Sequence, residues 1–562
     1  MSGSLKDKIL CRCEVSGEKF EVSNSEADYL QMRGFPLPRL SPSERQRRRL
    51  SFRNQRHLYR RKCSATGKPI ISMYSPDYPG PVVTQEYWFG DGWDPLEFGR
   101  EIDFTKPFFP QFHSLFLSVP QPSTMVTLSE NCEYNAYCAR SKDCYLSQSV
   151  AECENVYYTF APMQSRDCLD CHNVSNNCEL CYEVLFGSNC YDVRFSKNVA
   201  NCRESSFLYN CRNCSNCFFC SNLRNAEYYF GNEKLDRESY KAKVAQFLDM
   251  SYEDKVRLTK QFLEFQSTEI SPALWGTNNE NVTGNQIFHS KNVMYGFDIH
   301  ESEDVAYSTR CFGNKTCRDC NNVFIGEELY EVTSAFSSTR TSFSFSTYEG
   351  VSDTEYSGAV CYSSDLFGCV GIRRRNNCIL NIQYTKDEYR NLREKLIHHM
   401  KETGEWGEFF PVRISPFPFN DTVAQDFFPL AKEEAVRRGY RWRDSVTEEH
   451  PVSRNTIKLP ERSSEADESI CENVCSCERC GKGYKIQKKE LQLILKLRAP
   501  LPHKCFECRY SERMDQLELM QLKSCPCASC GIVIETCYMS QAGSAVEVRQ
   551  LLCEDCYAQA VN

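Results

Sequence analysis

The sequence lacks a long apolar segment. No run of 18 apolar residues occurs, so no membrane-spanning helix is predicted. The first residues, MSGSLKDKIL, also lack the apolar stretch of a secretory signal peptide. We therefore expect a cytoplasmic protein with no membrane partner, whose cysteines are kept reduced.

Familiar catalytic motifs are missing as well. There is no P-loop, no dinucleotide-binding fingerprint and no G-x-S-x-G. His398 and His399 are adjacent in a predicted helix, so their rings point apart, and HHMKE is not HExxH. The sequence contains no catalytic constellation that we recognise, and its 562 residues favour several domains.

Cysteine is abundant, with 35 residues in the chain. An odd number cannot be completely paired, and a reducing compartment disfavours disulfides. We therefore interpret these residues as thiols or metal thiolates.

The C-terminal region contains four CxxC pairs between residues 477 and 556. Two facing pairs supply four thiolates in a tetrahedron, which is the usual structural zinc geometry. We predict two structural zinc ions with sequential ligand sets, although a cross-braced arrangement, iron and an empty reduced site remain open. The predicted ligands are Cys477, Cys480, Cys505 and Cys508, then Cys527, Cys530, Cys553 and Cys556. Cys471, Cys475, Cys525 and Cys537 are assigned no metal.

The segment CERCGKGYKIQKKE, followed by PLPHKCFECRYSER, resembles the treble-clef "probable zinc ribbon" family. This resemblance covers about forty residues and implies a structural zinc ion. It says nothing about an activity.

The N-terminus repeats this region without most of its ligands. Residues 13–74 align without a gap with the residues that lie 464 positions later in the chain, and 14 of 62 positions are identical. Only Cys13 and Cys63 remain, because Ser16, Ser41, Glu44 and Thr66 replace the other cysteines. This copy is predicted to fold without metal. Its SPSE segment, residues 41–44, predicts a capping box with proline at the first helical position.

A strongly basic segment follows the predicted capping box. Residues 39–62 contain ten Arg or Lys and one acidic residue, and we predict a helix over residues 44–62. On that helix Arg45, Arg49, Arg53, Arg56 and Arg60 share one face. The face is predicted to bind RNA or another polyanion. Two alternatives are an acidic protein partner and the chain's own acidic surface, for which the linker residues Glu461, Glu465, Asp467 and Glu468 are candidates.

Residues 128–384 repeat an Asn or Asp followed by Cys or Val. The spacing within one series of cysteines, Cys144, Cys168, Cys190 and Cys211, is nearly constant. This pattern predicts a mostly β fold, a cysteine-rich parallel β-helix with about 22 residues per turn and half-period echoes. Asn and Asp tolerate left-handed corners, and the following Cys or Val is expected to point inward.

The segment YNCRNCSNCFFC places four cysteines at steps of three residues, at Cys211, Cys214, Cys217 and Cys220. In an extended strand such steps alternate between faces, so the four are not expected to converge. We predict Cys211 in the wall of the β-helix and the other three at corners or neighbouring wall positions. A metal ion between stacked corner thiols remains open.

Two helical segments interrupt or follow the repeats, at 234–265 and 385–410, and are interpreted as caps over open strand edges. The predicted layout is a degenerate ribbon-like repeat with the basic helix (1–118), the first β-helix half (119–233), a helical insertion (234–287), the second half (288–384), a helical cap (385–443), a linker (444–470) and a double zinc ribbon (471–562). This whole layout resembles an uncharacterised bacterial family that joins zinc ribbons to a cysteine-rich repeat domain, on the basis of segments 85–112 and 398–430. The resemblance implies no activity.

Taken together, these features predict a non-enzymatic zinc-binding scaffold or interaction protein, with RNA binding through the arginine helix. One alternative is a β-helix carbohydrate-active enzyme, a lyase or hydrolase. A cluster of exposed Asp, Glu and Arg on one face would favour that enzyme. The other alternative is a protein–protein adaptor that binds no nucleic acid.

Overall fold

The computed structural model describes residues 8–307, 309–312, 315–318, 321, 323–333, 335–348, 350–444, 457–538 and 550–561. The chain divides into two compact units, and each combines distant parts of the sequence. Unit 1 contains residues 1–124, 276–443 and 519–522. Unit 2 contains residues 125–275, 444–518 and 523–562.

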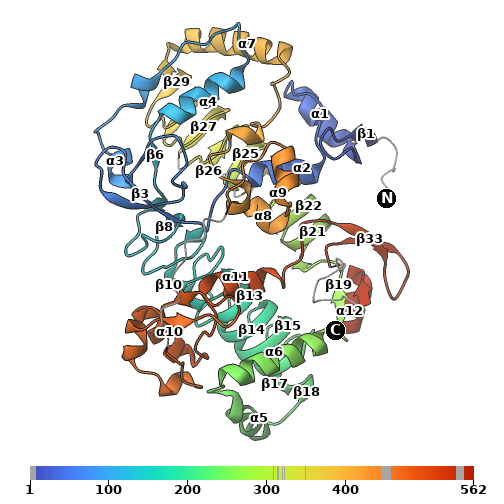
Figure 1. The fold of residues 1–562 in the computed structure, drawn as a ribbon. Helices are drawn as coiled ribbons and strands as arrows, with labels where there is room; N and C mark the ends of the chain where they lie inside the picture. The colour runs from blue at the N-terminus through green and yellow to red at the C-terminus, as the bar shows by residue number, and fades with distance from the viewer. Residues whose placement is uncertain are drawn as a thin grey trace. The chain divides into compact units, whose positions relative to one another are not determined.

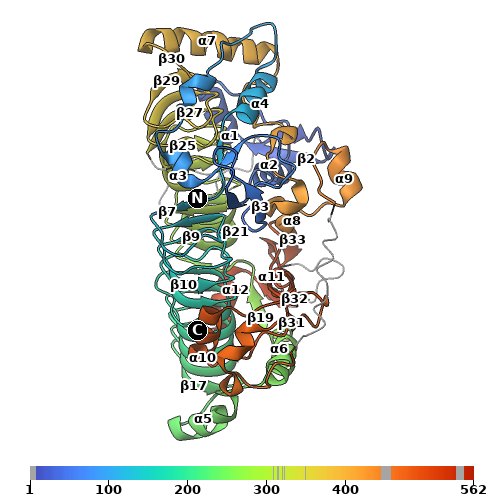
Figure 2. The same ribbon diagram turned by 60° about the vertical axis from the view of Figure 1, so that its left-hand side comes forward.

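The core of unit 2 is a series of parallel strands that we call the first stack, residues 125–234 (Figure 2). Tyr191 pairs with Arg203, and Arg203 pairs in turn with Ser215. Asn189 and Asn201, which stack in the same register, are 12 positions apart. The turn of about 22 residues that the cysteine series predicts is wrong, because that length spans about two of these 12-residue steps.

The strands of the first stack follow one another along the chain. They are β7 (Met125–Thr127), β8 (Tyr137–Ala139), β9 (Val150–Ala151), β10 (Glu154–Tyr157), β11 (Arg166–Leu169), β12 (His172–Ser175), β13 (Tyr182–Ser188), β14 (Tyr191–Ala200), β15 (Arg203–Arg212), β16 (Ser215–Ser221), β17 (Glu227–Phe230) and the antiparallel β18 (Glu233–Lys234).

A left-handed residue stands at about every third position of the first stack. Asn210, Asn213, Asn216 and Phe219 have φ between 50° and 60°, and each precedes one cysteine of YNCRNCSNCFFC. Each left-handed residue turns the chain, so every third side chain returns to the same side. Cys211, Cys214, Cys217 and Cys220 are therefore all buried in one cluster. The prediction that they alternate between faces is wrong.

Side-chain amides stack along the same register. Asn189 donates to Asn201, Asn201 to Asn213 and Asn213 to Asn225, over 2.7, 2.9 and 3.0 Å. The repeated Asn thus serves twice: it adopts the left-handed conformation, and its amide links consecutive strands. This pairing fixes the register of the stack.

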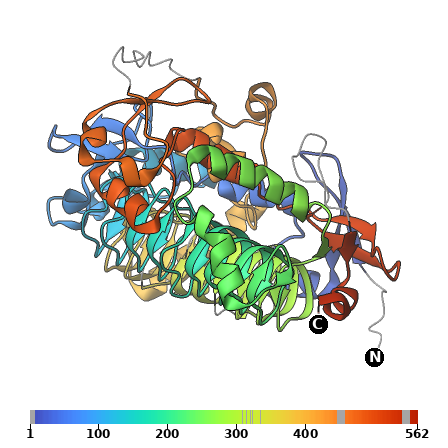
Figure 3. The ribbon, with the colours of Figure 1, turned by 90° about the horizontal axis from the view of Figure 1, so that it is seen from below.

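Helices and short hairpins surround the first stack in unit 2. Helix α6 packs against β15 (Figure 1), and α5 packs on β17 at the end of the stack (Figure 2), an end that Figure 3 views with both helices in green. The helices are α5 (Arg237–Val244), α6 (Tyr252–Gln266), α10 (Lys488–Leu497), α11 (Phe506–Met514) and α12 (Glu554–Val561). The remaining strands are β19 (Ile270–Pro272), β31 (Cys475–Ser476), β32 (Gly483–Tyr484), β33 (Lys523–Pro526), β34 (Val533–Thr536) and β35 (Gln550–Leu552).

Unit 1 contains a second stack, residues 276–383, with the same parallel register, as in Val351↔Ser363 and Leu366↔Cys378. It starts within the predicted helical insertion, because β20 begins at Gly276. The strands are β20 (Gly276–Thr277), β21 (Glu280–Phe288), β22 (Lys291–His300), β23 (Thr309–Phe312), β24 (Lys315–Arg318), β25 (Val323–Tyr330), β26 (Ala335–Thr339), β27 (Val351–Glu355), β28 (Ser363–Phe367), β29 (Asn376–Ile379) and β30 (Ile382–Gln383).

The other elements of unit 1 come from the N-terminal segment and from residues 386–443. Helix α7 packs against β29 (Figure 1). An aromatic cluster inside unit 1 includes Phe112 and Phe410, whose ring centroids are 4.7 Å apart. The helices are α1 (Asn24–Met32), α2 (Pro42–Leu50), α3 (Gln85–Phe89), α4 (Phe108–Ser118), α7 (Lys386–Glu402), α8 (Val423–Phe427) and α9 (Lys432–Arg437). The strands are β1 (Lys8–Arg12), β2 (Lys19–Ser23), β3 (Tyr59–Lys62), β4 (Pro69–Ser72), β5 (Val82–Val83) and β6 (Gln121–Pro122).

Candidate metal centres and the helices beside them

Two groups of four cysteines come together in unit 2. Cys477, Cys480, Cys505 and Cys508 form the first group, and Cys527, Cys530, Cys553 and Cys556 form the second. Within each group all four sulfurs lie within 4.8 Å of one another, so the structure groups the eight cysteines sequentially and not in a cross-braced arrangement. Both groups can hold a metal ion.

The sulfur spacing fits a tetrahedral ion. Sγ of Cys480 lies 3.7 Å from Sγ of Cys505, and Sγ of Cys530 lies 3.7 Å from Sγ of Cys553. A tetrahedron with metal–sulfur bonds of about 2.3 Å has an edge of about 3.8 Å. The one sulfur pair given for each group thus matches a tetrahedral edge, and the remaining sulfurs lie within 4.8 Å.

A tight turn aims backbone amides at the first sulfur of each group. Gly481 and Gly531 have φ of 71° and 75°, a conformation that favours glycine. Amides of Cys530 and Cys553 lower the pKa of Cys527 to about 6. Burial raises the pKa of Cys477, but amides of Cys505 and Cys480 outweigh this effect and bring it to about 6. Both sulfurs are thus prepared as thiolates, the form that binds metal.

The N-terminal segment forms the same turns at positions shifted by 464. Gly17 and Gly67 have φ of 72° and 70°, and each donates to the carbonyl of Cys13 or Cys63, at 2.9 and 2.8 Å. The corresponding bonds at Gly481 and Gly531 are 2.9 and 3.0 Å. The turn itself is therefore encoded by the glycine and its neighbours, since two of its four copies lack the second cysteine.

The predicted capping box at the start of α2 is not formed. Ser41 is the N-cap and Pro42 follows it, as predicted, but the Ser41 side chain makes no capping bond. Its hydroxyl lies 3.2 Å from the Ser43 hydroxyl, and Glu44 pairs with Arg47 and Arg438 instead. The basic residues nearby compete successfully for the carboxylate that the box requires.

The structural correspondence extends beyond the ungapped alignment. The amide of Thr84 donates to the Cys63 sulfur, as the amide of Cys553 does to Cys527, at 3.3 Å in the latter case. Thr84 caps α3, and Cys553 directly precedes α12. The sequence comparison missed Thr84 because the loop before it is five residues shorter. A gap placed after residue 74 would have found it.

The arginine residues do not form one exposed helical face. Helix α2 ends at Leu50, so Arg53 and Arg56 follow the helix, and Arg60 lies in β3. Arg45, Arg49 and Arg53 are buried, with 1%, 0% and 5% of their surface exposed, and of the five only Arg60 is exposed. The predicted stripe is therefore wrong, since phosphates cannot reach three of its members.

Helix α11 is joined to the first stack by a buried ionic network, which we call the clasp of unit 2. Arg509 pairs with Glu490 (3.3 Å) and with Asp170, and Arg513 pairs with the same Asp170. The Tyr158 hydroxyl donates to Glu490 over 2.8 Å, and Arg509 lies 4.4 Å from the centre of the Tyr158 ring. Burial raises the pKa of the Glu490 carboxyl, and Arg509 opposes that shift.

Unit 1 contains a matching clasp at positions shifted by 464. Arg45 pairs with Glu26 (3.4 Å) and lies 5.0 Å from the centre of the Tyr307 ring, and the Tyr307 hydroxyl lies 3.4 Å from Glu26. Arg49 donates to Asn321 over 2.9 Å, where Arg513 meets Asp170. Arg45 is thus neutralised within the chain, as the intramolecular alternative expected, but by Glu26 and not by the linker acids offered as candidates.

A row of charged residues lines an open groove on the first stack. Glu130, Lys142, Glu154, Arg166 and Glu179 follow one another in parallel register and line an open groove of about 1240 Å³. Neighbouring charges in this row pair with one another, for example Lys142 with Glu130 (3.4 Å) and Arg166 with Glu179 (2.8 Å). The row therefore links consecutive strands by charge.

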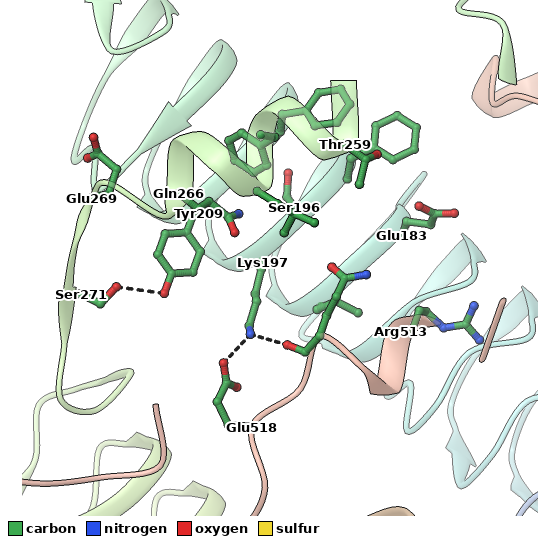
Figure 4. A pocket seen from close by; sticks show the side chains of 16 residues that line it. Glu183, Ser196, Lys197, Tyr209, Thr259, Gln266, Glu269, Ser271, Arg513 and Glu518 are labelled. Carbon is green, nitrogen blue, oxygen red and sulfur yellow. Dashed lines mark hydrogen bonds and ion pairs between the residues drawn. The ribbon is translucent and has the colours of Figure 1, made fainter. Parts of the chain in front are cut away.

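A small, partly open pocket lies between α6, strands β13 to β15 and the end of α11 (Figure 4). Its volume of about 60 Å³ holds roughly two water molecules. Lys197 donates to the carbonyl of Gln516 (2.7 Å) and pairs with Glu518 (2.5 Å), and Tyr209 lies 3.1 Å from the Ser271 hydroxyl. Lys197 and Tyr209 thus already have partners, whereas the buried Thr259 hydroxyl that also lines the pocket has none among the described residues.

Comparison with known proteins identifies no family. No protein-family model matches the chain, and no curated protein matches it. A solved structure, the "putative acetyltransferase from Desulfovibrio desulfuricans G20", aligns with 54% of this chain and 87% of its own at 9% identity, with a TM-score of 0.11. That score carries no argument about fold or activity. Within the described residues, no helix is long and apolar enough to cross a bilayer.

Proposed function

We propose that the chain is a non-enzymatic scaffold that binds two structural zinc ions. The observation that carries this proposal is the pair of four-cysteine groups, whose sulfur spacing fits a tetrahedron. Four thiolates with no open position are typical of structural zinc, whereas catalytic zinc keeps a position for water or substrate. The ions would stabilise the folded C-terminal module, which includes α11 and contacts the first stack through that helix.

We propose that the N-terminal module, which contains the turns at Gly17 and Gly67, and the C-terminal module, which contains the two four-cysteine groups, derive from one ancestral sequence. The matching turns support this proposal, and so do the two clasps with Glu26, Arg45 and Arg49 in one and Glu490, Arg509 and Arg513 in the other. Each stack is proposed to be a parallel β-helix in which one turn equals one pairing step, supported by the parallel register and the regular left-handed positions. Zinc would then be required by only one of the two modules.

The scaffold is proposed to act through a protein partner in preference to RNA. Burial of Arg45, Arg49 and Arg53 removes the basic face that favoured a polyanion. The alternative of a carbohydrate-active enzyme has one supporting observation, the groove lined by Glu130, Glu154 and Glu179. The paired charges of that row support a role in strand register instead.

Metal analysis of the intact, reduced protein tests the proposal. We expect about two zinc ions per chain and little iron, because each closed four-thiolate site holds one ion. The chain shortened to residues 1–470 is the control, and it should contain no zinc. Zinc retained by the shortened chain, or a zinc-free intact protein, would contradict the proposed sites.

A further inference from the structure

Four turns of the same kind occur in the chain, two in the N-terminal module and two in the C-terminal module. They begin at Cys13, Cys63, Cys477 and Cys527, and in each the glycine four residues later donates to the carbonyl of that cysteine over 2.8 to 3.0 Å. Four positions of each turn lie at the surface: the residue before the cysteine, the residue after it and the two residues after the glycine. All of them are exposed in all four turns. Backbone bonding and exposure are thus matched, and only the residue types differ.

The turn at Cys527 is apolar at all four of these positions, and we call Pro526, Ala528, Ile532 and Val533 the apolar tip. Its counterparts are Arg12, Glu14, Glu18 and Lys19 at Cys13, Lys62, Ser64, Lys68 and Pro69 at Cys63, and Ser476, Glu478, Lys482 and Gly483 at Cys477. Ten of these twelve residues are charged or carry a hydroxyl group. The turn therefore tolerates polar residues at its surface, and the apolar tip needs a separate reason.

The apolar side chains are gathered at the end of the hairpin of β33 and β34. Pro526 and Val533 are direct partners in this antiparallel pair, so their side chains share one face of the hairpin. Ile532 precedes Val533, and the two residues are 60% and 70% exposed. Leaving these side chains in water forgoes the free energy that their burial would release. Apolar side chains that gather at one exposed place are a feature of interaction surfaces.

The face of the hairpin that carries Pro526 and Val533 is negatively charged. Glu535 lies two residues beyond Val533 in β34, hence on the same face, and it is exposed. Lys523 pairs with Thr536, so it belongs to the opposite face. The charge beside the apolar tip is therefore that of the glutamate.

Two more acidic residues stand at the start of α12. Glu554 and Asp555 are exposed and directly follow Cys553, whose Sγ lies 3.7 Å from Sγ of Cys530 in the turn of the apolar tip. Acidic residues suit the N-terminus of a helix, which accounts for these two, whereas Glu535 in its strand has no such reason. All three residues add negative charge around the tip.

We propose that the apolar tip is the surface through which the chain binds a protein partner, and that this partner presents apolar side chains next to Lys or Arg. The inference rests on the proposed scaffold function and adds the binding surface and the chemistry of the partner. Burial of the apolar side chains supplies affinity, and opposite charges at the rim orient the partner and speed its association. A membrane surface fits less well, because anionic lipids repel the acidic residues.

Selection from a library of random linear peptides on the zinc-loaded, full-length chain tests the inference, and the best binder is then synthesised for affinity measurement. The selected peptides should combine apolar residues with Lys or Arg. Ile532→Ser with Val533→Ser installs a residue type found at two of the equivalent turns and should weaken binding about tenfold or more. Glu535→Gln should weaken binding about two- to fivefold and flatten its dependence on salt.

The matched control is Glu478→Ser with Lys482→Ser, at the equivalent turn of the first four-cysteine group. It should bind the peptide as the wild type does. Because all of the substituted side chains are exposed, the variants are expected to fold and to keep two zinc ions. If the Ile532→Ser, Val533→Ser variant does not fold, Ile532→Ser alone decides, since Ile532 lies outside β34.

Zinc content is measured in parallel, so this inference and the proposed scaffold are judged separately. Equal peptide binding in all variants overturns the inference and leaves the zinc scaffold in place, as does a library that yields no binder or only acidic binders. Self-association that is lost in the double variant of the tip would identify a second copy of the chain as the occupant and would also overturn it. A wild-type chain without zinc contradicts the scaffold, and the affinity of the double variant then still decides the inference.

Discussion

Replacing Cys505 and Cys508 by serine is expected to remove one of two zinc ions and to unfold the first half of the C-terminal module. Cys505 is the residue before α11 and Cys508 lies in its first turn, so the ion anchors the start of that helix. Binding of a structural zinc ion contributes about 10–16 kcal/mol of folding free energy, which the metal-free module lacks. The measurements are zinc per chain and the thermal unfolding profile of the purified variant.

Two further variants make this expectation specific. Cys527→Ser with Cys530→Ser should remove the other ion and leave zinc in the first group. Cys471→Ser with Cys475→Ser changes two nearby cysteines outside both groups and should leave two ions in place. Loss of both ions in every variant would show that the two groups are not independent sites.

Changing Asp170 to asparagine is expected to destabilise unit 2 strongly. The Asp170 side chain is fully buried and pairs with both Arg509 and Arg513, which are also buried. Removing the negative charge leaves two buried cations with Glu490 as the remaining acidic partner of the clasp. Breaking a buried ion pair in this way costs about 3–5 kcal/mol. Denaturant unfolding of the zinc-loaded protein measures the change.

Asp167 provides a matched control three residues away. Both aspartates adopt left-handed backbone conformations, with φ of 51° and 55°, and both precede a cysteine. Asp167 pairs with Lys496, whose side chain is 53% exposed. Because Lys496 is largely exposed, and because asparagine at position 167 can still accept the hydrogen bond from Asn155, Asp167→Asn should cost less than about 1 kcal/mol. Equal losses of unfolding free energy in the two variants would mean that the ion pairs of the clasp add no stability beyond that of an aspartate at a left-handed position.

The positions of the metal ligands and of the left-handed corners could be predicted from sequence. Repeated CxxC pairs specify four-thiolate groups, and Asn or Asp before Cys identifies the corners. The period was misjudged because each pairing step of the stack contains several similar Asn–Cys dipeptides, so cysteines about two pairing steps apart were compared. The convergence of Cys211, Cys214, Cys217 and Cys220 depends on the left-handed residues between them, which an extended-strand rule ignores.

The clasps were visible in the alignment without being recognised. Glu26, Arg45 and Arg49 are identical to Glu490, Arg509 and Arg513 under the 464-residue shift, although none of these residues is a metal ligand. Charge composition alone suggested a solvent-facing stripe, because it does not show which acids fold against which bases. Contacts of Arg48 with Glu331 and Glu408, hundreds of residues away, depend on the tertiary fold.

Hydrogen exchange of the intact protein, with and without a zinc chelator, tests the central claim that one module depends on metal and its counterpart does not. The comparison uses the turns at Gly17 and Gly67 and the turns at Gly481 and Gly531, which share the same backbone bonds. We predict that chelation removes protection at Gly481, Gly531 and along α11, while Gly17, Gly67 and α2 keep theirs. Equal loss in both modules, or no loss in either, would contradict the account.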